Sequence, residues 1–229
     1  MKFLCLDLSL HCGFAVLEAE PISVPAIGHP QFTTPKLLDY GTLHYEGLSV
    51  KERDNYPWSY LGVVNEHIHQ IMETVVLKVK PDIIVIEETN KGKNRYSQKM
   101  LEFLHCELLK QIGFLSFRSD MGPIGFKKLP PDVIYLDTSA WRSTLGIWMS
   151  KDQKKQNAKL SKAKKEGPEA LKKMKKSLGV RGRVNKKHLA LAHVNTTFNL
   201  TLKVKDNDAS DAICLGLAYL NGTKPSNGV

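Results

Sequence analysis

The stretch that decides the fold lies near the N-terminus, where residues 3–16 read FLCLDLSLHCGFAV. Residues 2–7 are apolar up to Asp7 and predict a short strand, and residues 13–17 predict a second strand after a tight turn. An unpaired carboxylate inside apolar sequence is costly, so such an acid normally has a partner or a metal. Asp7 is therefore the first sign of a site at this end of the predicted sheet.

Working outward, strand and helix patterns alternate along the chain. Residues 19–37 hold four prolines and predict an irregular loop, and Thr138 and Ser139 are candidate helix N-caps. Further strands are expected at residues 38–45, 82–87 and 132–136. Helices are expected at residues 58–79, 97–112, 185–198 and 207–220. This order predicts an antiparallel meander continued into a mixed five-stranded α/β sheet with helices on both faces.

Composition narrows the class of protein. The 229 residues suit one domain, and 42% hydrophobic with 24% charged residues excludes wholesale disorder. No stretch approaches the ~18 apolar residues of a membrane span, so we expect no membrane partner. The first six residues resemble the start of a signal peptide, but Asp7 interrupts them and no cleavage site follows. Four widely spaced cysteines argue against a zinc site or disulfide scaffold, and we expect a cytoplasmic protein.

The positive charge is concentrated in one segment. The formal net charge is +10, and residues 151–187 hold 13 lysines and two arginines against three acidic residues. The remainder of the chain is close to neutral. A near-neutral body with one dense basic arm indicates a polyanionic partner, most simply nucleic acid. A solvated lysine-rich loop is the alternative interpretation.

Acidic residues form the candidate site. Asp7 ends the first strand, Glu87 ends the fourth, and Asp208 and Asp211 share one face of the last predicted helix. If the first and fourth strands are neighbours, Asp7 and Glu87 lie side by side, and small residues allow the helix to bring its two acids against them. Each acid alone also fits a turn, a cap or a solvated face. The combination indicates a site.

Gathered carboxylates repel one another, and divalent cations remove that cost. Hard oxygen ligands favour Mg²⁺, with Mn²⁺ as a substitute, over zinc. Two such ions about 4 Å apart suit attack of water on a phosphodiester. With a basic arm to hold the polyanion, this set of residues is typical of a nuclease.

Three motifs in this order resemble the RuvC family of Holliday-junction resolvases, within the RNase H-like superfamily. The first is the strand, Asp7, Ser9 and Gly13 of residues 3–16. The second is residues 83–88, IIVIEE, which Lys93 and Asn94 follow. The third is residues 207–212, NDASDA. The resemblance covers most of the chain. It departs at Ser9, where the family usually has glycine, in the long loop of residues 19–37, and in a lysine-rich stretch at about 149–184.

The resemblance implies one RNase H-like nuclease domain over residues 1–229, with a basic insertion at about 149–184. The departures from the family pattern are similar to a phage or viral branch of the family. The resemblance also implies a homodimer that makes paired nicks in four-way junctions or other branched DNA. Each active site would hold two Mg²⁺ ions. If the chain is phage-encoded, the protein would work in the host cytoplasm. By position, the catalytic and metal-binding residues are Asp7, Glu87, Asp208 and Asp211. Candidate DNA contacts are Lys91, Lys93, Asn94, Arg95, Lys186 and Lys187. Lys187 lies where the family carries a lysine near the active site.

Two other functions stay open from the sequence. The same fold suits an RNase H-like ribonuclease that acts on RNA–DNA hybrids. A non-catalytic protein that binds branched DNA is the third possibility, and it would require the four acids to be dispensable.

Overall fold

The computed structural model places the N-terminal strands in one antiparallel group. It describes residues 1–23, 30–46, 57–88, 95–119, 131–180 and 182–226. β1 (Lys2–Asp7) pairs with β2 (His11–Glu18), and β2 pairs with β5 (Lys36–His44). The predicted meander is confirmed, and its second strand is longer than expected at both ends.

The second half of the sheet is parallel. β6 (Ile83–Glu87) pairs with β1, and β7 (Asp132–Leu136) pairs with β6, which gives the order β5-β2-β1-β6-β7. The first and fourth predicted strands are therefore neighbours. Helical connections precede both parallel strands, as parallel pairing requires. The predicted α/β fold, a mixed five-stranded sheet with helices on both faces, is confirmed.

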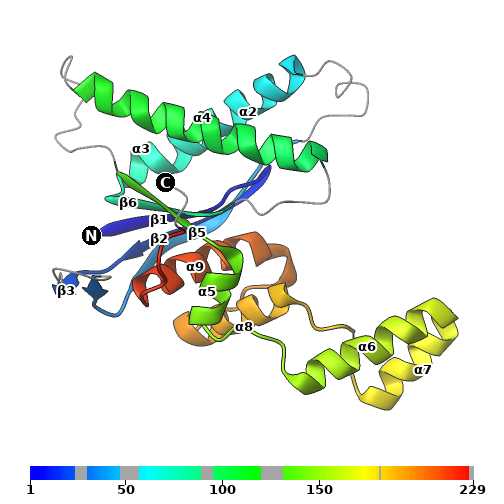
Figure 1. The fold of residues 1–229 in the computed structure, drawn as a ribbon. Helices are drawn as coiled ribbons and strands as arrows, with labels where there is room; N and C mark the ends of the chain where they lie inside the picture. Colours follow the sequence, from blue (N-terminus) through cyan, green and yellow to red (C-terminus); the bar gives the residue numbers. More distant parts are fainter. Residues whose placement is uncertain (24–29, 47–56, 89–94, 120–130, 181, 227–229) are drawn as a thin grey trace.

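Helices cover both faces of this sheet (Figure 1). One face carries α2 (Trp58–Ile71), a π-helical turn (Met72–Val76), α3 (Leu77–Val79) and α4 (Arg95–Ser119). The other face carries α5 (Thr138–Thr144), α8 (Lys186–Phe198) and α9 (Asn207–Leu220). Within the ranges given above, no helix is long and apolar enough to cross a membrane.

Two local features differ from the sequence-based expectation. The loop of residues 19–37 contains a small second sheet, in which β3 (Pro21–Ser23) pairs with β4 (Gln31–Phe32). The N-cap of α5 is Asp137, whose carboxylate accepts hydrogen bonds from the backbone N–H groups of Ser139 and Ala140. Thr138 and Ser139 are already inside the helix. A carboxylate also favours the positive end of the helix dipole.

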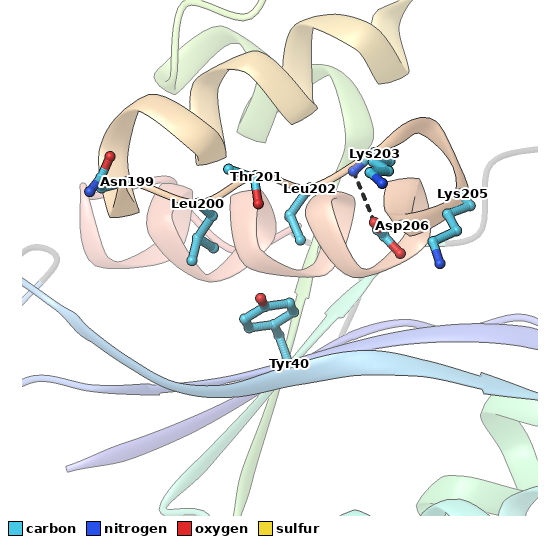
Figure 2. A pocket seen from close by; sticks show the side chains of 8 residues that line it. All are labelled: Tyr40, Asn199, Leu200, Thr201, Leu202, Lys203, Lys205 and Asp206. Atoms are coloured by element: carbon cyan, nitrogen blue, oxygen red, sulfur yellow. Dashed lines mark hydrogen bonds between the residues drawn. The ribbon is translucent and has the colours of Figure 1, made fainter.

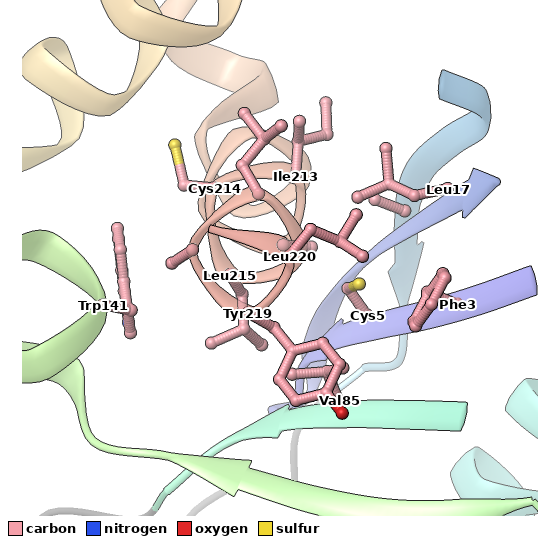
Figure 3. Packing of buried hydrophobic residues seen from close by; sticks show 14 of the residues in the cluster. Phe3, Cys5, Leu17, Val85, Trp141, Ile213, Cys214, Leu215, Tyr219 and Leu220 are labelled. Carbon is pink, nitrogen blue, oxygen red and sulfur yellow. The ribbon is translucent and has the colours of Figure 1, made fainter. Parts of the chain in front are cut away.

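The sheet separates two apolar cores because successive strand residues face opposite sides. Leu4 and Leu6 of β1 pack with α2 and α4, whereas Phe3 and Cys5 pack with α9. Figure 3 shows this second core, in which α9 lies over β1 and β2 with Trp141 of α5 beside it. Every α9 residue from Ala209 to Leu220 is buried. By the same alternation, Asp7 and Glu87 fall on the α9 face of the sheet.

The lysine-rich segment folds into two helices. α6 (Lys151–Glu166) and α7 (Pro168–Leu178) form a hairpin that extends away from the sheet (Figure 1). A short 3₁₀ turn (Val204–Asp206) leads into α9. The hairpin is inserted in the chain between α5 and α8, two helices of the α9 face.

Candidate active site

The ends of β1 and β6 bring two acids together. Leu6 is in register with Ile86 across the parallel pair, so Asp7 and Glu87 are the next residues on adjacent strands. The Glu87 carboxylate accepts a short hydrogen bond from the Thr138 hydroxyl at the start of α5. The sheet and α5 together fix this side of the site.

The other two acids come from the first turns of α9, which lies unusually close to the sheet. Asp7 is paired across β1 and β2 with Gly13, and a Cβ added to Gly13 would lie 2.0 Å from the Asp208 carbonyl oxygen. Further along α9, a Cβ on Gly216 would lie 2.5 Å from the Cys5 sulfur. Side chains at either glycine would push the helix away, because real Cβ contacts are essentially never this short. Gly13 and Gly216 therefore allow Asp208 and Asp211 to reach the strand ends.

Asp7 is electrostatically linked to each of the other three carboxylates. Burial raises the pKa of Asp7 well above its usual range, and the negative charges of Glu87, Asp211 and Asp208 raise it further. Burial also raises the pKa of Glu87, although Thr138 and Arg142 oppose the shift. For Asp211, burial outweighs the opposing effect of Arg142 and raises the pKa to about 6. The predicted acidic constellation is thus assembled in the folded chain.

Two basic side chains neutralise part of this charge. Lys187 Nζ lies 2.9 Å from Asp208 Oδ1, and Arg142 Nη2 lies 3.6 Å from Asp211 Oδ2. Burial lowers the pKa of Lys187, but the hydrogen bond to Asp208 and the charges of the other acids outweigh it, so the net shift is upward. Arg142 is only 6% exposed, and its Nε and Nη1 atoms have no hydrogen-bond partner among the described residues.

Three residues of the site were not predicted from the sequence in these roles. Arg142 and Thr138 are each more than fifty residues in the chain from all four clustered acids, and nothing in the local pattern pairs them with the cluster. Gly13 carries a weak signal, because a glycine inside a strand often marks close approach of another backbone. Lys187 was expected near the active site, and the structure places it beside Asp208.

The chemistry of the donor set fits a divalent cation. Four clustered carboxylates carry more negative charge than Arg142 and Lys187 neutralise, and the buried Asp211 Oδ1 has no hydrogen-bond partner in the described chain. As positioned here, no three acidic, histidine or cysteine side chains of the described residues form a ready coordination group. Asp208 is held by Lys187 and Asn207, and Glu87 by Thr138. Ligation would therefore require these side chains to exchange protein partners for the ion.

The remaining predicted DNA contacts are only partly described. Lys186 is exposed at the start of α8, with its Nζ 6.0 Å from the centre of the Trp148 ring. Arg95 is the first residue of α4, at the end of a segment that follows Glu87. Lys91, Lys93 and Asn94 lie outside the described residues.

Asp206 is not part of the acidic cluster. Its carboxylate accepts a hydrogen bond of 2.9 Å from the Lys203 backbone N–H. It lines a separate pocket of about 420 Å³ between Tyr40 of β5 and the segment 199–206 (Figure 2). The pocket contains none of the four clustered acids.

Comparison with known proteins gives structural similarities only. No family model and no curated protein matches the chain. The chain is similar to the Thermus thermophilus RuvC structure, with 12% identity, a TM-score of 0.49, and coverage of 99% of this chain and 100% of that one. For T. thermophilus RuvC in complex with Holliday junction substrate, the identity is 12%, the TM-score 0.49, and the coverage 99% of each chain. For the yeast mitochondrial Holliday junction resolvase Ydc2 the identity is 10%, the TM-score 0.48, and the coverage 96% of this chain and 78% of that one.

Proposed function

We propose that this protein is a divalent-cation-dependent endonuclease that cuts branched DNA, with four-way junctions as its principal substrate. The observation that carries the proposal is the meeting of Asp7 and Glu87, on adjacent parallel strands, with Asp208 and Asp211 at the start of α9. The motif resemblance described above assigns metal-binding roles to these same four residues. The lysine-rich hairpin adds the positive surface that a polyanionic substrate needs.

The carboxylates of Asp7, Glu87, Asp208 and Asp211 would hold two Mg²⁺ ions, or Mn²⁺ in their place. Bound ions of this kind activate water for attack and stabilise the leaving 3′ oxygen. The chain itself supplies the fixed frame. The two strand ends, the short hydrogen bond from Thr138 and the closely packed α9 hold the acids before substrate arrives.

Lys187 and Arg142 have different roles in this proposal. The Lys187 side chain is 48% exposed, so it can leave Asp208 and contact a DNA phosphate. Arg142 is buried and stays behind Asp211 and Glu87, where it orients the carboxylates. Lys187 is thus the substrate-facing cation and Arg142 the structural one.

A symmetric junction needs two cuts, and a two-fold homodimer would provide two equivalent sites. The outer surface of the α2 and α4 layer offers apolar material for such a contact. Trp58, Leu61, Leu109 and Phe114 are all exposed there. Light scattering coupled to size exclusion would give the mass of the assembly, and 25.7 kDa would exclude the dimer.

A cleavage assay on four labelled substrates tests the proposed function. Wild-type protein is incubated with a four-way junction, a flap, a linear duplex and an RNA–DNA hybrid, each with Mg²⁺ and with EDTA. We expect Mg²⁺-dependent paired nicks in the junction. Cutting of the hybrid alone would assign the protein to the ribonucleases, and no cutting of any substrate with Mg²⁺ or Mn²⁺ would leave the non-catalytic DNA-binding function.

A further inference from the structure

The α6–α7 hairpin is a self-contained projection whose two flanking segments contact each other. α6 packs against α7 rather than against the sheet (Figure 1). At the base, the Asn157 side chain donates to the Val184 carbonyl oxygen at 2.6 Å and accepts from the Val184 N–H at 3.0 Å. Asn157 is buried, and its amide also lies 3.2 Å from the Met149 sulfur. These contacts tie the two stems of the hairpin, the segments before and after it, to α6 and to each other.

The stems connect the hairpin to the acidic cluster. One stem follows α5, which carries Arg142, and the other leads into α8, whose second residue is Lys187. Trp148 on the first stem lies beside Lys186 on the second. The hairpin is therefore connected directly to α5 and α8, the two helices that supply Arg142 and Lys187 to the site. A ligand bound along the hairpin would be bound by a segment that joins these two helices.

The lysines of the hairpin are free to meet a ligand. α6 and α7 together contain eleven lysines against Asp152, Glu166 and Glu169. Within residues 151–178, which the structure describes completely, no lysine forms an ion pair with an acid. Lysines left unpaired at this density repel one another, and a polyanion relieves that repulsion.

The charges on α6 are arranged by face. Asn157, Leu160 and Ala163 are buried and recur at helical spacing, which marks the face that packs. Exposed lysines recur at a spacing of four, four and three residues on another face, and we call this set the lysine stripe: Lys151, Lys155, Lys159 and Lys162. Along a helix these residues span roughly 16 Å, at a rise of 1.5 Å per residue. The stripe is a continuous basic edge along the flank of the hairpin.

The residue types on the hairpin select the part of the DNA that it contacts. Residues 151–180 contain no aromatic side chain to stack on an unpaired base and no arginine to read a guanine edge. The tip, where α6 meets α7, carries Glu166 and Glu169 on either side of Gly167 and Pro168. Acids at the tip disfavour its insertion into a groove lined by phosphates. Lysines along the flank favour the outside of the sugar–phosphate backbone.

We propose that the flank of the α6–α7 hairpin, through the lysine stripe, is a sequence-independent clamp for the phosphate backbone of a duplex arm next to the cleaved strand. The inference deepens the proposed function and rests on it for the identity of the DNA. It assigns the insertion the task of holding duplex, while the acidic cluster performs the cleavage.

Paired charge-removal variants test the clamp. The stripe variant combines Lys155→Gln, Lys159→Gln and Lys162→Gln, and the control combines Lys36→Gln, Lys78→Gln and Lys224→Gln, three exposed lysines elsewhere on the chain. Both variants lose the same net charge, and glutamine is a good helix former. Circular dichroism checks that both stay folded. Affinity for a four-way junction and for two duplexes of unrelated sequence is measured by fluorescence anisotropy in Ca²⁺, between 50 and 200 mM salt.

We expect the slope of log affinity against log salt to become shallower by about 3 in the stripe variant, since each lost phosphate contact removes about 1. The change should be equal for the two duplex sequences, and the control should keep the wild-type slope. Equal slopes in stripe variant and control would overturn the clamp, as would a loss confined to one duplex sequence. Cleavage by the wild type is scored separately. If the wild type cuts the junction but the stripe variant keeps the wild-type slope, the clamp alone is refuted. If the slope of the stripe variant changes but the wild type cuts nothing, the nuclease function alone is refuted.

Discussion

The guanidinium of Arg142 and the carboxylate of Asp211 form a buried ion pair beneath the acidic cluster, with Nη2 and Oδ2 separated by 3.6 Å. Both side chains are at most 7% exposed. Arg142 also lowers the pKa of Glu87 against the larger effect of burial. Arg142 thus places one buried positive charge beside both Asp211 and Glu87.

Replacing Arg142 with methionine should destabilise the protein, because a buried carboxylate loses its counter-charge. Breaking a buried pair costs on the order of 3 kcal/mol. The loss should be larger at pH 8 than at pH 5, since Asp211, with a pKa of about 6, can become neutral at the lower pH. Urea denaturation at both pH values measures it. The Arg142→Met/Asp211→Asn double variant should recover part of the stability, and simple additivity of the two changes would contradict the pairing.

The Gly13→Ala substitution should disturb the site without touching any acid. Its Cβ would lie 2.0 Å from the Asp208 carbonyl oxygen, which is backbone and cannot rotate away. We expect a loss of roughly 2 kcal/mol, as for overpacking elsewhere, together with a strong loss of cleavage as α9 shifts. Gly62→Ala on the exposed face of α2 is the control, since nothing lies within 4 Å of its added Cβ. If both variants melt and cleave alike, close packing of α9 does not position the acids.

The stabilisation that Mg²⁺ gives should depend on pH. Burial raises the pKa of Asp211 from 3.8 to about 6 and raises that of Asp7 as well, so folding favours their neutral forms. For Asp211, that contribution to stability is fully present below pH 4 and is lost as the pH rises through 6. A cation should restore it by binding the ionised acids.

Thermal melting with Mg²⁺ and with EDTA, at pH 5 and pH 8, checks this. With the ion at tenfold its Kd, about 1.4 kcal/mol of binding free energy should raise Tm by roughly 3–5 °C at pH 8. The rise should nearly vanish at pH 5. Asp7→Asn should abolish the difference at both pH values, and an equal rise in that variant would place the ion elsewhere.

Much of the fold follows from short-range patterns in the sequence. Residues 3–6 and 83–86 are apolar on both faces, as strands buried between two helical layers must be, and an acid follows each run. The spacing of Asp208 and Asp211 places them on one helical face before any tertiary contact is known. These patterns predicted the sheet, its mixed pairing and the four acids that cluster.

The features that were missed depend on tertiary contacts. Arg142 looks like an ordinary charge near the end of a short helix, and only the packing of α5 against α9 turns it toward Asp211. Gly13 matters because its Cα lies close to the α9 backbone, and a glycine inside a strand gives only a weak signal of such an approach. The small β3–β4 sheet interrupts a proline-rich loop, where propensity alone disfavours strands.

The most direct test of the central claim is cleavage of one labelled four-way junction by wild type and by four single variants: Asp7→Asn, Glu87→Gln, Asp208→Asn and Asp211→Asn. Each is assayed with Mg²⁺ and with EDTA, and junction binding is measured in parallel in Ca²⁺. We expect the wild type to make paired nicks with Mg²⁺ only. Each variant should lose cutting by at least about 100-fold, as for loss of a key electrostatic group. Junction binding by the variants should be unchanged or tighter, because a charge that repels phosphate is gone. Cutting in EDTA, or wild-type cutting by the Asp7→Asn variant, would contradict the account.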